Sequence, residues 1–146
     1  MNKPTYQLEQ TPDGFWYEFD SENNGRIIRK AVAYYPTDSS EIYQLVFGDL
    51  NEDGSINFFS VSNNNDMAKI LSTVISTLSQ FFERNPTKIV IFRGSTDTRT
   101  RLYRAVISKL LMQVSNDFEV RGINYDETIE LFQPNTDYFA YVINKK

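Results

Sequence analysis

The chain has 146 residues, of which 40% are hydrophobic and 14% aromatic, and its formal net charge is −4. This length and composition predict one globular domain over residues 1–146 with a real hydrophobic core. The net negative charge argues against general binding to nucleic acid or to anionic membranes, but it leaves room for a local basic patch.

The sequence contains neither cysteine nor histidine. Disulfides, thiolate catalysis, histidine general bases and the usual zinc sites are therefore excluded, and we expect no metal centre and no cofactor. The chain also has no apolar run long enough for a transmembrane helix and no apolar signal region after Met1. These features predict a cytoplasmic protein without a membrane partner.

The N-terminal half reads as a series of strands. Asn24-Gly25 is a strong hairpin signal between two of them. Lys30 and the arginines of the strand that follows this turn suit an edge or a solvent-facing side. The expected strands cover residues 5–10 (weakly), 15–19, 26–35, 42–50 and 56–61.

Residues Asp49 to Ile56 allow two interpretations. Oxygen-bearing side chains at Asp49, Asn51 and Asp53, followed by Gly54, match the first half of a calcium loop. However, Ser60 stands where such a loop needs a bidentate acid, and Asp53-Gly54 is a standard hairpin turn. The sequence favours the turn.

A helix is expected over residues 66–84, because its apolar residues recur at the spacing of one helical face. The preceding run contains Asn64 and Asp66, both of which can cap a helix through a side-chain oxygen. The opposite face carries mainly Ser, Thr and Gln, so it is only weakly charged. Such a face leaves open a contact with a second subunit in a homodimer.

The segment from Lys88 to Val114 predicts a strand, a tight turn and a second helix. Ile89–Phe92 is an unbroken apolar run of the kind found in strands buried on both faces, and Gly94 ends it. A helix then fits residues 97–114, and Arg99 falls within its apolar stripe. A fixed cation in that position needs a partner, since an unpaired buried charge is very costly.

The sequence predicts a binding site at this turn. Helix N-termini present free backbone N–H groups and a positive dipole end, so they suit phosphate, carboxylate or sulfate. The competing interpretation is structural: a hydroxyl caps the helix and Arg99 pairs with a neighbouring carboxylate. The candidate ligand-binding residues are Gly94, Ser95, Thr96, Arg99, Arg101 and Tyr103, joined by Asn64 and Asp66 if both helices start at one end of the sheet.

Further strands are expected at 118–123, 128–132 and 138–144, with Phe118 and Val120 facing inward. Hairpins combined with two interleaved helices predict an α+β fold. We expect a mostly antiparallel sheet with both long helices packed on one face.

The run Ser62-Asn63-Asn64-Asn65-Asp66 and the motif G-S-T-x-x-R-x-R-L-Y from Gly94 to Tyr103 resemble a family of short bacterial proteins of unknown function. The resemblance covers most of the chain from residue 42 to the C-terminus. It implies a bacterial cytoplasmic protein and supplies no activity.

Three functions stay open from the sequence. The first is a binding module for an anion, such as a nucleotide or a nucleic-acid phosphate, at Gly94–Tyr103. The second is a homo-oligomeric interaction module, suggested by the mild face of the 66–84 helix and the many aromatic residues. The third is an enzyme acting on a phosphorylated or nucleic-acid substrate through Asp66, Arg99, Arg101 and Tyr103.

Overall fold

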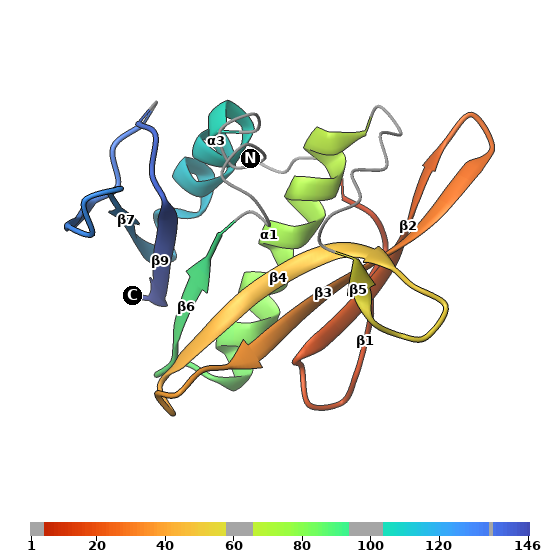
Figure 1. Cartoon of the computed structure of the whole chain (residues 1–146), viewed down its shortest axis with the longest axis horizontal. Helices are drawn as coiled ribbons and strands as arrows, with labels where there is room; N and C mark the ends of the chain where they lie inside the picture. The colour runs from red at the N-terminus through yellow and green to blue at the C-terminus, as the bar shows by residue number, and fades with distance from the viewer. Residues whose placement is uncertain (1–4, 58–65, 94–103, 135) are drawn as a thin grey trace.

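The computed structural model describes residues 5–57, 66–93, 104–134 and 136–146. Within these residues the fold is α+β, with a nine-stranded, mostly antiparallel sheet and two helices (Figure 1). The helices are α1 (Met67–Arg84) and α3 (Arg104–Val114). The strands are β1 (Glu9–Gln10), β2 (Trp16–Asn23), β3 (Arg26–Pro36), β4 (Ile42–Leu50), β5 (Ile56–Asn57), β6 (Ile89–Phe92), β7 (Phe118–Ile123), β8 (Ile129–Leu131) and β9 (Ala140–Lys145).

The strands lie in the order β1-β2-β3-β4-β6-β9-β7-β8, and β5 pairs with β4 outside this path. All of these pairs are antiparallel except β4 with β6, which run parallel with Ile42 opposite Ile89. Strand β9 inserts between β6 and β7, so the last strand in the chain is internal to the sheet.

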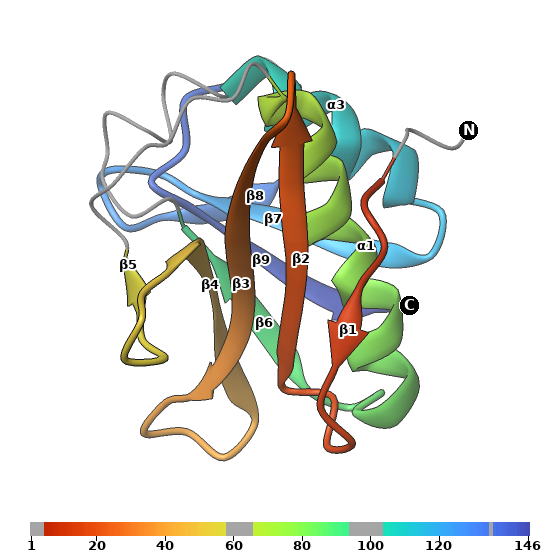
Figure 2. The same cartoon turned by 90° about the vertical axis from the view of Figure 1, so that its right-hand side faces the viewer.

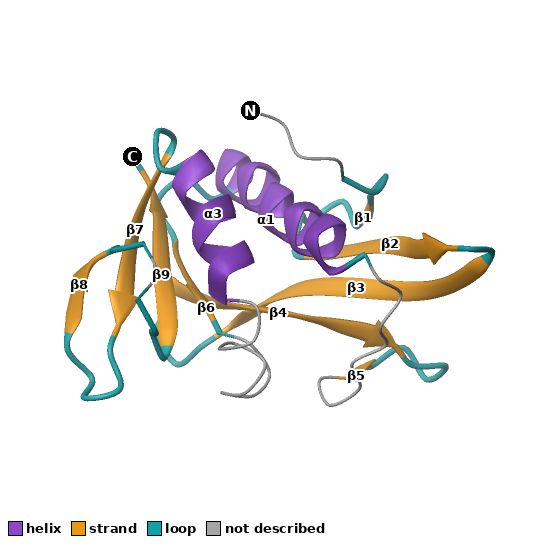
Figure 3. Cartoon of the chain, turned by 90° about the horizontal axis from the view of Figure 1, so that it is seen from above, coloured by secondary structure: helices purple, strands orange, loops and turns teal. Residues whose placement is uncertain are grey.

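Both helices lie on one face of the sheet, which bends around them when viewed from above (Figure 3). The inward residues of the strands and the apolar stripes of both helices form one core. Aromatic residues fill its centre: Phe81 of α1 stacks on Tyr34 of β3, with ring centroids 4.3 Å apart. The predicted arrangement of helices and sheet is thus confirmed.

Local turn chemistry explains the hairpins. Asn24 and Gly25 both have positive φ, 53° and 81°, as a tight two-residue hairpin turn requires. The β4–β5 turn is likewise a hairpin: Asn51 N donates to Ser55 O at 2.8 Å, and Asp53 Oδ1 accepts from Ser55 N at 3.0 Å. The hairpin interpretation of Asp49–Ile56 is therefore correct.

One strand expectation was wrong. Lys30 was assigned to an edge or solvent-facing side, but β3 lies between β2 and β4, and Lys30 is only 5% exposed. It lies on the face that carries the core residues Val32 and Tyr34, and it forms an ion pair with Asp49 of β4. The charge is tolerated inside because a carboxylate directly opposite in the register neutralises it.

Strand β6 lies inside the sheet, between β4 and β9, but the prediction that it is buried on both faces was wrong, because it is buried on only one. Val90 and Phe92 point into the core, whereas Ile89 and Ile91 are partly exposed on the other side. The reason is that α1 and α3 both pack on the same face of the sheet (Figure 3).

The mild polar flank of α1 is largely covered by the chain itself. Thr73 and Thr77 are fully buried. Thr73 Oγ1 accepts a hydrogen bond from Tyr6 N at 2.9 Å, and Thr77 Oγ1 lies 2.6 Å from Tyr34 Oη. The N-terminal segment runs beside α1 on its way to β1 (Figure 2). Short hydroxyl side chains at these positions let that segment and β3 approach the helix closely.

Candidate functional site

One end of the sheet gathers the starts of both helices. Strand β6 is parallel to β4, and α1 returns the chain from the end of β4 to the start of β6. Strand β7 also runs parallel to β6, because both are antiparallel to β9. Helices α1 and α3 therefore both begin at the end of the sheet where β6 and β7 finish, as Figure 1 shows.

Seven of the predicted site residues lie outside the residues that the structure describes: Asn64, Gly94, Ser95, Thr96, Arg99, Arg101 and Tyr103. For the segment 94–103, the structure describes only the residues on either side. Phe92 and Arg93 lead into the segment 94–103, and α3 follows it at Arg104. Asp66 is the one predicted site residue that is described.

Asp66 precedes α1 but does not cap it with its side chain. Its backbone carbonyl accepts from Ile70 N at 2.9 Å, which closes the first helical turn. Its carboxylate turns instead toward β2 and the N-terminal segment, where Oδ2 accepts hydrogen bonds from Tyr6 Oη at 2.5 Å and from Ser21 Oγ. The side chain of Asp66 thus accepts no hydrogen bond from the first N–H groups of α1.

Tyr6, in the N-terminal segment, joins β2 and α1 around this carboxylate. Its ring stacks on Phe19 of β2 with centroids 5.6 Å apart, and Lys69 Nζ of α1 lies 4.2 Å from the ring centroid. Its hydroxyl accepts from Glu22 N at 3.1 Å. Burial, and then the hydrogen bond to Asp66, raise the pKa of Tyr6. Sequence reasoning missed this residue, because residues 5–10 carry only a weak strand pattern.

Apart from the Asp66 carboxylate at the N-cap of α1, the described helix starts carry no negative charge. Neither α1 nor α3 has an acidic residue in its first turn. An acidic residue there would partly neutralise the positive end of the helix dipole. Lys69 adds a positive charge in the first turn of α1. The arrangement can therefore interact favourably with an anion placed at this end.

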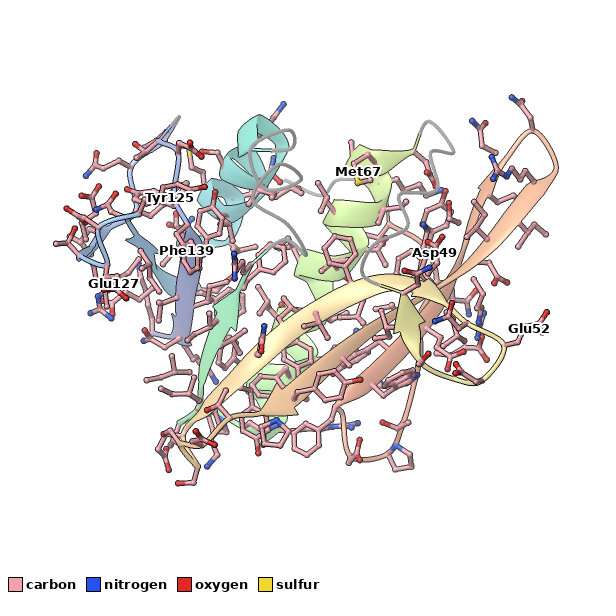
Figure 4. All side chains as sticks on the ribbon, in the orientation of Figure 1. Asp49, Glu52, Met67, Tyr125, Glu127 and Phe139 are labelled. Atoms are coloured by element: carbon pink, nitrogen blue, oxygen red, sulfur yellow. The ribbon has the colours of Figure 1, made fainter. Side chains whose placement is uncertain are left out.

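A second cluster lies at the same end, built from residues that sequence reasoning did not select. Arg93 follows β6, Tyr125 follows β7, and Phe139 precedes β9. The guanidinium carbon of Arg93 lies 4.0 Å from the ring centroid of Phe139. The rings of Tyr125 and Phe139 meet edge to face, 5.8 Å apart at 81°. Tyr125 is 42% exposed, and Figure 4 labels both aromatic residues.

Only long-range strand pairing brings these three residues together. Phe139 N donates to Ile123 O at 2.7 Å, which fixes the start of β9 beside the end of β7. The β6–β9 register places Phe92 opposite Tyr141, so Arg93 continues toward Phe139. The sequence does show Tyr125 among the turn-forming residues Asn124 and Asp126. Its contact with Phe139 could not be predicted without the sheet order.

Within the described ranges, no three acidic side chains gather as a metal site would require. Asp49 pairs with Lys30, and Asp53 accepts from Ser55 Oγ at 2.6 Å within its own turn. These hydrogen bonds from Ser55 lower the pKa of Asp53. The structure contains, in its described part, no helix long and apolar enough to span a membrane.

The chain is similar to a known protein family, as its sequence comparison shows. No curated protein and no protein of solved structure is significantly similar to this chain. The model of a family of unknown function, DUF6934, matches residues 2–146, which is nearly the whole chain. The chain therefore belongs to the DUF6934 family of unknown function.

Proposed function

We propose that this protein is a binding module that recognises an anionic or phosphorylated ligand at the connection between β6 and α3. The backbone and hydroxyls of Gly94, Ser95 and Thr96 bind the anion in this proposal, and Arg99 and Arg101 supply positive charge. Tyr103 completes the set from the start of the helix. As the family resemblance implies, the setting is a bacterial cytoplasm.

The observation that carries the proposal is the convergence of α1 and α3 at one end of the sheet without an acidic residue in either first turn. Two helix dipoles then present their positive ends to the same region. In the sequence, the arginines of the motif lie between β6 and α3. A phosphate there would meet backbone N–H groups and guanidinium groups together.

Asp66 and Asn64 take different parts in this proposal. The Asp66 carboxylate is engaged by Tyr6 and Ser21, so it positions the start of α1 against β2 instead of contacting an anion. Asn64 is close to Asp66 in the chain and carries no charge, which makes it the better ligand donor of the two.

A thermal-shift titration with phosphate, sulfate and nucleotides tests the proposal on the wild type and on Arg99→Ala. At about 100 times Kd, a ligand that binds only the native state adds about 2.7 kcal/mol. For a domain of this size, such a gain raises Tm on the order of 5–10 °C. We expect an anion to raise the Tm of the wild type but not that of Arg99→Ala.

Arg121→Ala is the matched control, because Arg121 lies on an exposed face of β7 in an ion pair with Glu119 at 2.6 Å. It should keep the full ligand response. If no anion shifts the wild type, or if Arg99→Ala responds like the wild type, the proposal is wrong.

The two alternatives have less support. The homo-oligomer hypothesis rested on the polar flank of α1, and Thr73 and Thr77 on that flank are buried within the chain itself. The enzyme hypothesis named Asp66 as a reacting group, and two hydroxyls occupy one oxygen of that carboxylate. A binding module needs no reacting group and is consistent with both findings.

A further inference from the structure

We infer that the ligand of the proposed anion site is a nucleoside phosphate whose base stacks on Tyr125, beside the Arg93–Phe139 pair. This inference rests on the proposed function, since the phosphate of the same ligand would occupy the β6–α3 connection. It adds Tyr125, which lies outside the Gly94–Tyr103 motif, to the site, and it narrows the ligand from any anion to a nucleoside phosphate.

The first argument is position. Arg93 is the residue immediately before Gly94, so its backbone leads directly into the proposed phosphate-binding turn. Its side chain lies against Phe139, and Phe139 contacts Tyr125. The three side chains therefore form a continuous group that extends from Arg93, the residue before Gly94, past the start of β9 to the residues that follow β7.

The second argument is rigidity. Tyr125 sits in the turn between β7 and β8, where Asn124 N donates to Thr128 O at 2.8 Å and Glu127 N donates to Asn124 O at 2.9 Å. Asp126 Oδ1 accepts from Thr128 N at 3.0 Å. The turn is thus closed by its own hydrogen bonds, so little backbone ordering would be needed when a ring stacks on Tyr125.

The third argument is chemistry. An exposed aromatic ring beside an arginine stacked on a second ring is an arrangement that proteins use to hold nucleic-acid bases, since every base has a π-face. Asp126 and Glu127 directly follow Tyr125 in the sequence and would repel a phosphate. The uncharged base therefore belongs at Tyr125, and the phosphate belongs on the side of Gly94.

Binding measured by calorimetry on the full chain tests this inference with four probes: inorganic phosphate, ribose 5-phosphate, AMP and a short single-stranded oligonucleotide. We expect AMP to bind the wild type about tenfold more tightly than ribose 5-phosphate, as base stacking on one aromatic side chain implies. Tyr125→Ala should remove this tenfold advantage while leaving phosphate binding unchanged. Tyr125→Phe, which keeps the ring, should retain it.

Tyr35→Ala is the matched control, because Tyr35 is 43% exposed and lies at the end of β3, away from this cluster. It should bind all four probes as the wild type does. A Tyr125-dependent gain for AMP alone identifies a free nucleotide as the ligand, and a larger gain for the oligonucleotide identifies a single strand.

The failures are distinguishable. If inorganic phosphate and ribose 5-phosphate bind but AMP binds no more tightly, or if Tyr125→Ala leaves the AMP advantage intact, this inference is wrong and the anion site stands. If none of the four probes binds, the proposed function fails and this inference fails with it.

Discussion

Tyr138 packs directly against the backbone of Gly122, so closely that a Cβ atom on residue 122 would lie 2.3 Å from Cε1 of the tyrosine ring. Tyr138 is completely buried, and its hydroxyl donates to Glu130 Oε2 at 2.7 Å. The ring therefore cannot move away without breaking its own contacts, and β7 requires glycine at this position for steric reasons.

We accordingly expect Gly122→Ala to lower the free energy of unfolding by about 3 kcal/mol, at the upper end of overpacking costs. Urea denaturation of the purified variant measures it. In the Tyr138→Ala background the same substitution should cost much less, because its obstacle is gone. Equal costs in both backgrounds would contradict the steric explanation.

The buried ion pair between Lys30 and Asp49 predicts that removing one partner destabilises the protein more than removing both. Removing one partner leaves the other charge buried, so Lys30→Met should cost about 3 kcal/mol. The double variant Lys30→Met/Asp49→Leu should be more stable than Lys30→Met alone. Lys88→Met is the control, since Lys88 pairs with the exposed Glu41 at 3.5 Å and should cost less than about 1 kcal/mol.

Two buried tyrosines differ in whether their hydroxyl has a partner. Tyr34 Oη lies 2.6 Å from Thr77 Oγ1, whereas Tyr17 Oη is buried without a hydrogen-bond partner among the described residues. We expect Tyr17→Phe to stabilise the protein by about 1 kcal/mol and Tyr34→Phe to destabilise it by about 1 kcal/mol. Chemical denaturation of both variants gives the comparison. The explanation fails if both substitutions change stability in the same direction.

Tyr17 also predicts how stability changes at alkaline pH. Burial raises the pKa of Tyr17 to about 12, and the nearby Arg84 only partly opposes this. Because the folded-state pKa exceeds the ordinary value of about 10, the contribution to stability is complete below pH 10 and is lost between pH 10 and about 12.

This loss is absent in Tyr17→Phe, so the free energy of unfolding of the variant should fall less steeply with pH than that of the wild type. Between pH 9 and pH 11 the wild type should lose about 1 kcal/mol more than the variant. Burial of Tyr34 raises its pKa as well, but that group is common to both proteins. Denaturation curves at pH 9 and pH 11 test the prediction. Parallel curves for the two proteins would show that Tyr17 does not titrate as the structure implies.

Tyr6 tests whether the N-terminal segment positions the start of α1. Tyr6→Phe keeps the ring between Phe19 and Lys69 but removes the hydrogen bond to Asp66, and it should cost about 1 kcal/mol. Tyr6→Ala also loses the ring contacts and should cost clearly more. Hydrogen exchange at the first amides of α1 should increase in both variants. Unchanged exchange there would assign Tyr6 no role in holding the helix start.

Much of the fold could be predicted from local patterns. The stripe from Ile70 to Phe82 and the Asn24-Gly25 turn each depend on residues close in sequence, and both were correct. Lys30 was misplaced because a charge in a strand favours exposure on average, and its partner Asp49 is identified only by the β3–β4 register.

The candidate site shows the same difference between local signals and long-range contacts. Arg99 and the Gly94-Ser95-Thr96 run could be proposed from the sequence because they form a local motif, and they stay a prediction, since they lie outside the described residues. Tyr125 and Phe139 could not be proposed in this way, because their contact depends on β9 inserting beside β7. Tyr6 was missed for a similar reason, since its interactions with Asp66 and Thr73 join distant parts of the chain.

The single parallel pairing in the sheet has a consequence for the order of folding. Strands β1–β5 form one antiparallel group and β6–β9 another, and in the described sheet the two groups are hydrogen-bonded to each other only through the four residue pairs of β4 and β6. Antiparallel hairpins close short loops, whereas this seam requires α1 to cross the sheet first. We therefore expect the β2–β3–β4 meander to form early and the seam to close in the rate-limiting step. Substitutions at Ala33 and at Val90 should then both slow refolding, because the contacts of both residues are formed by that step.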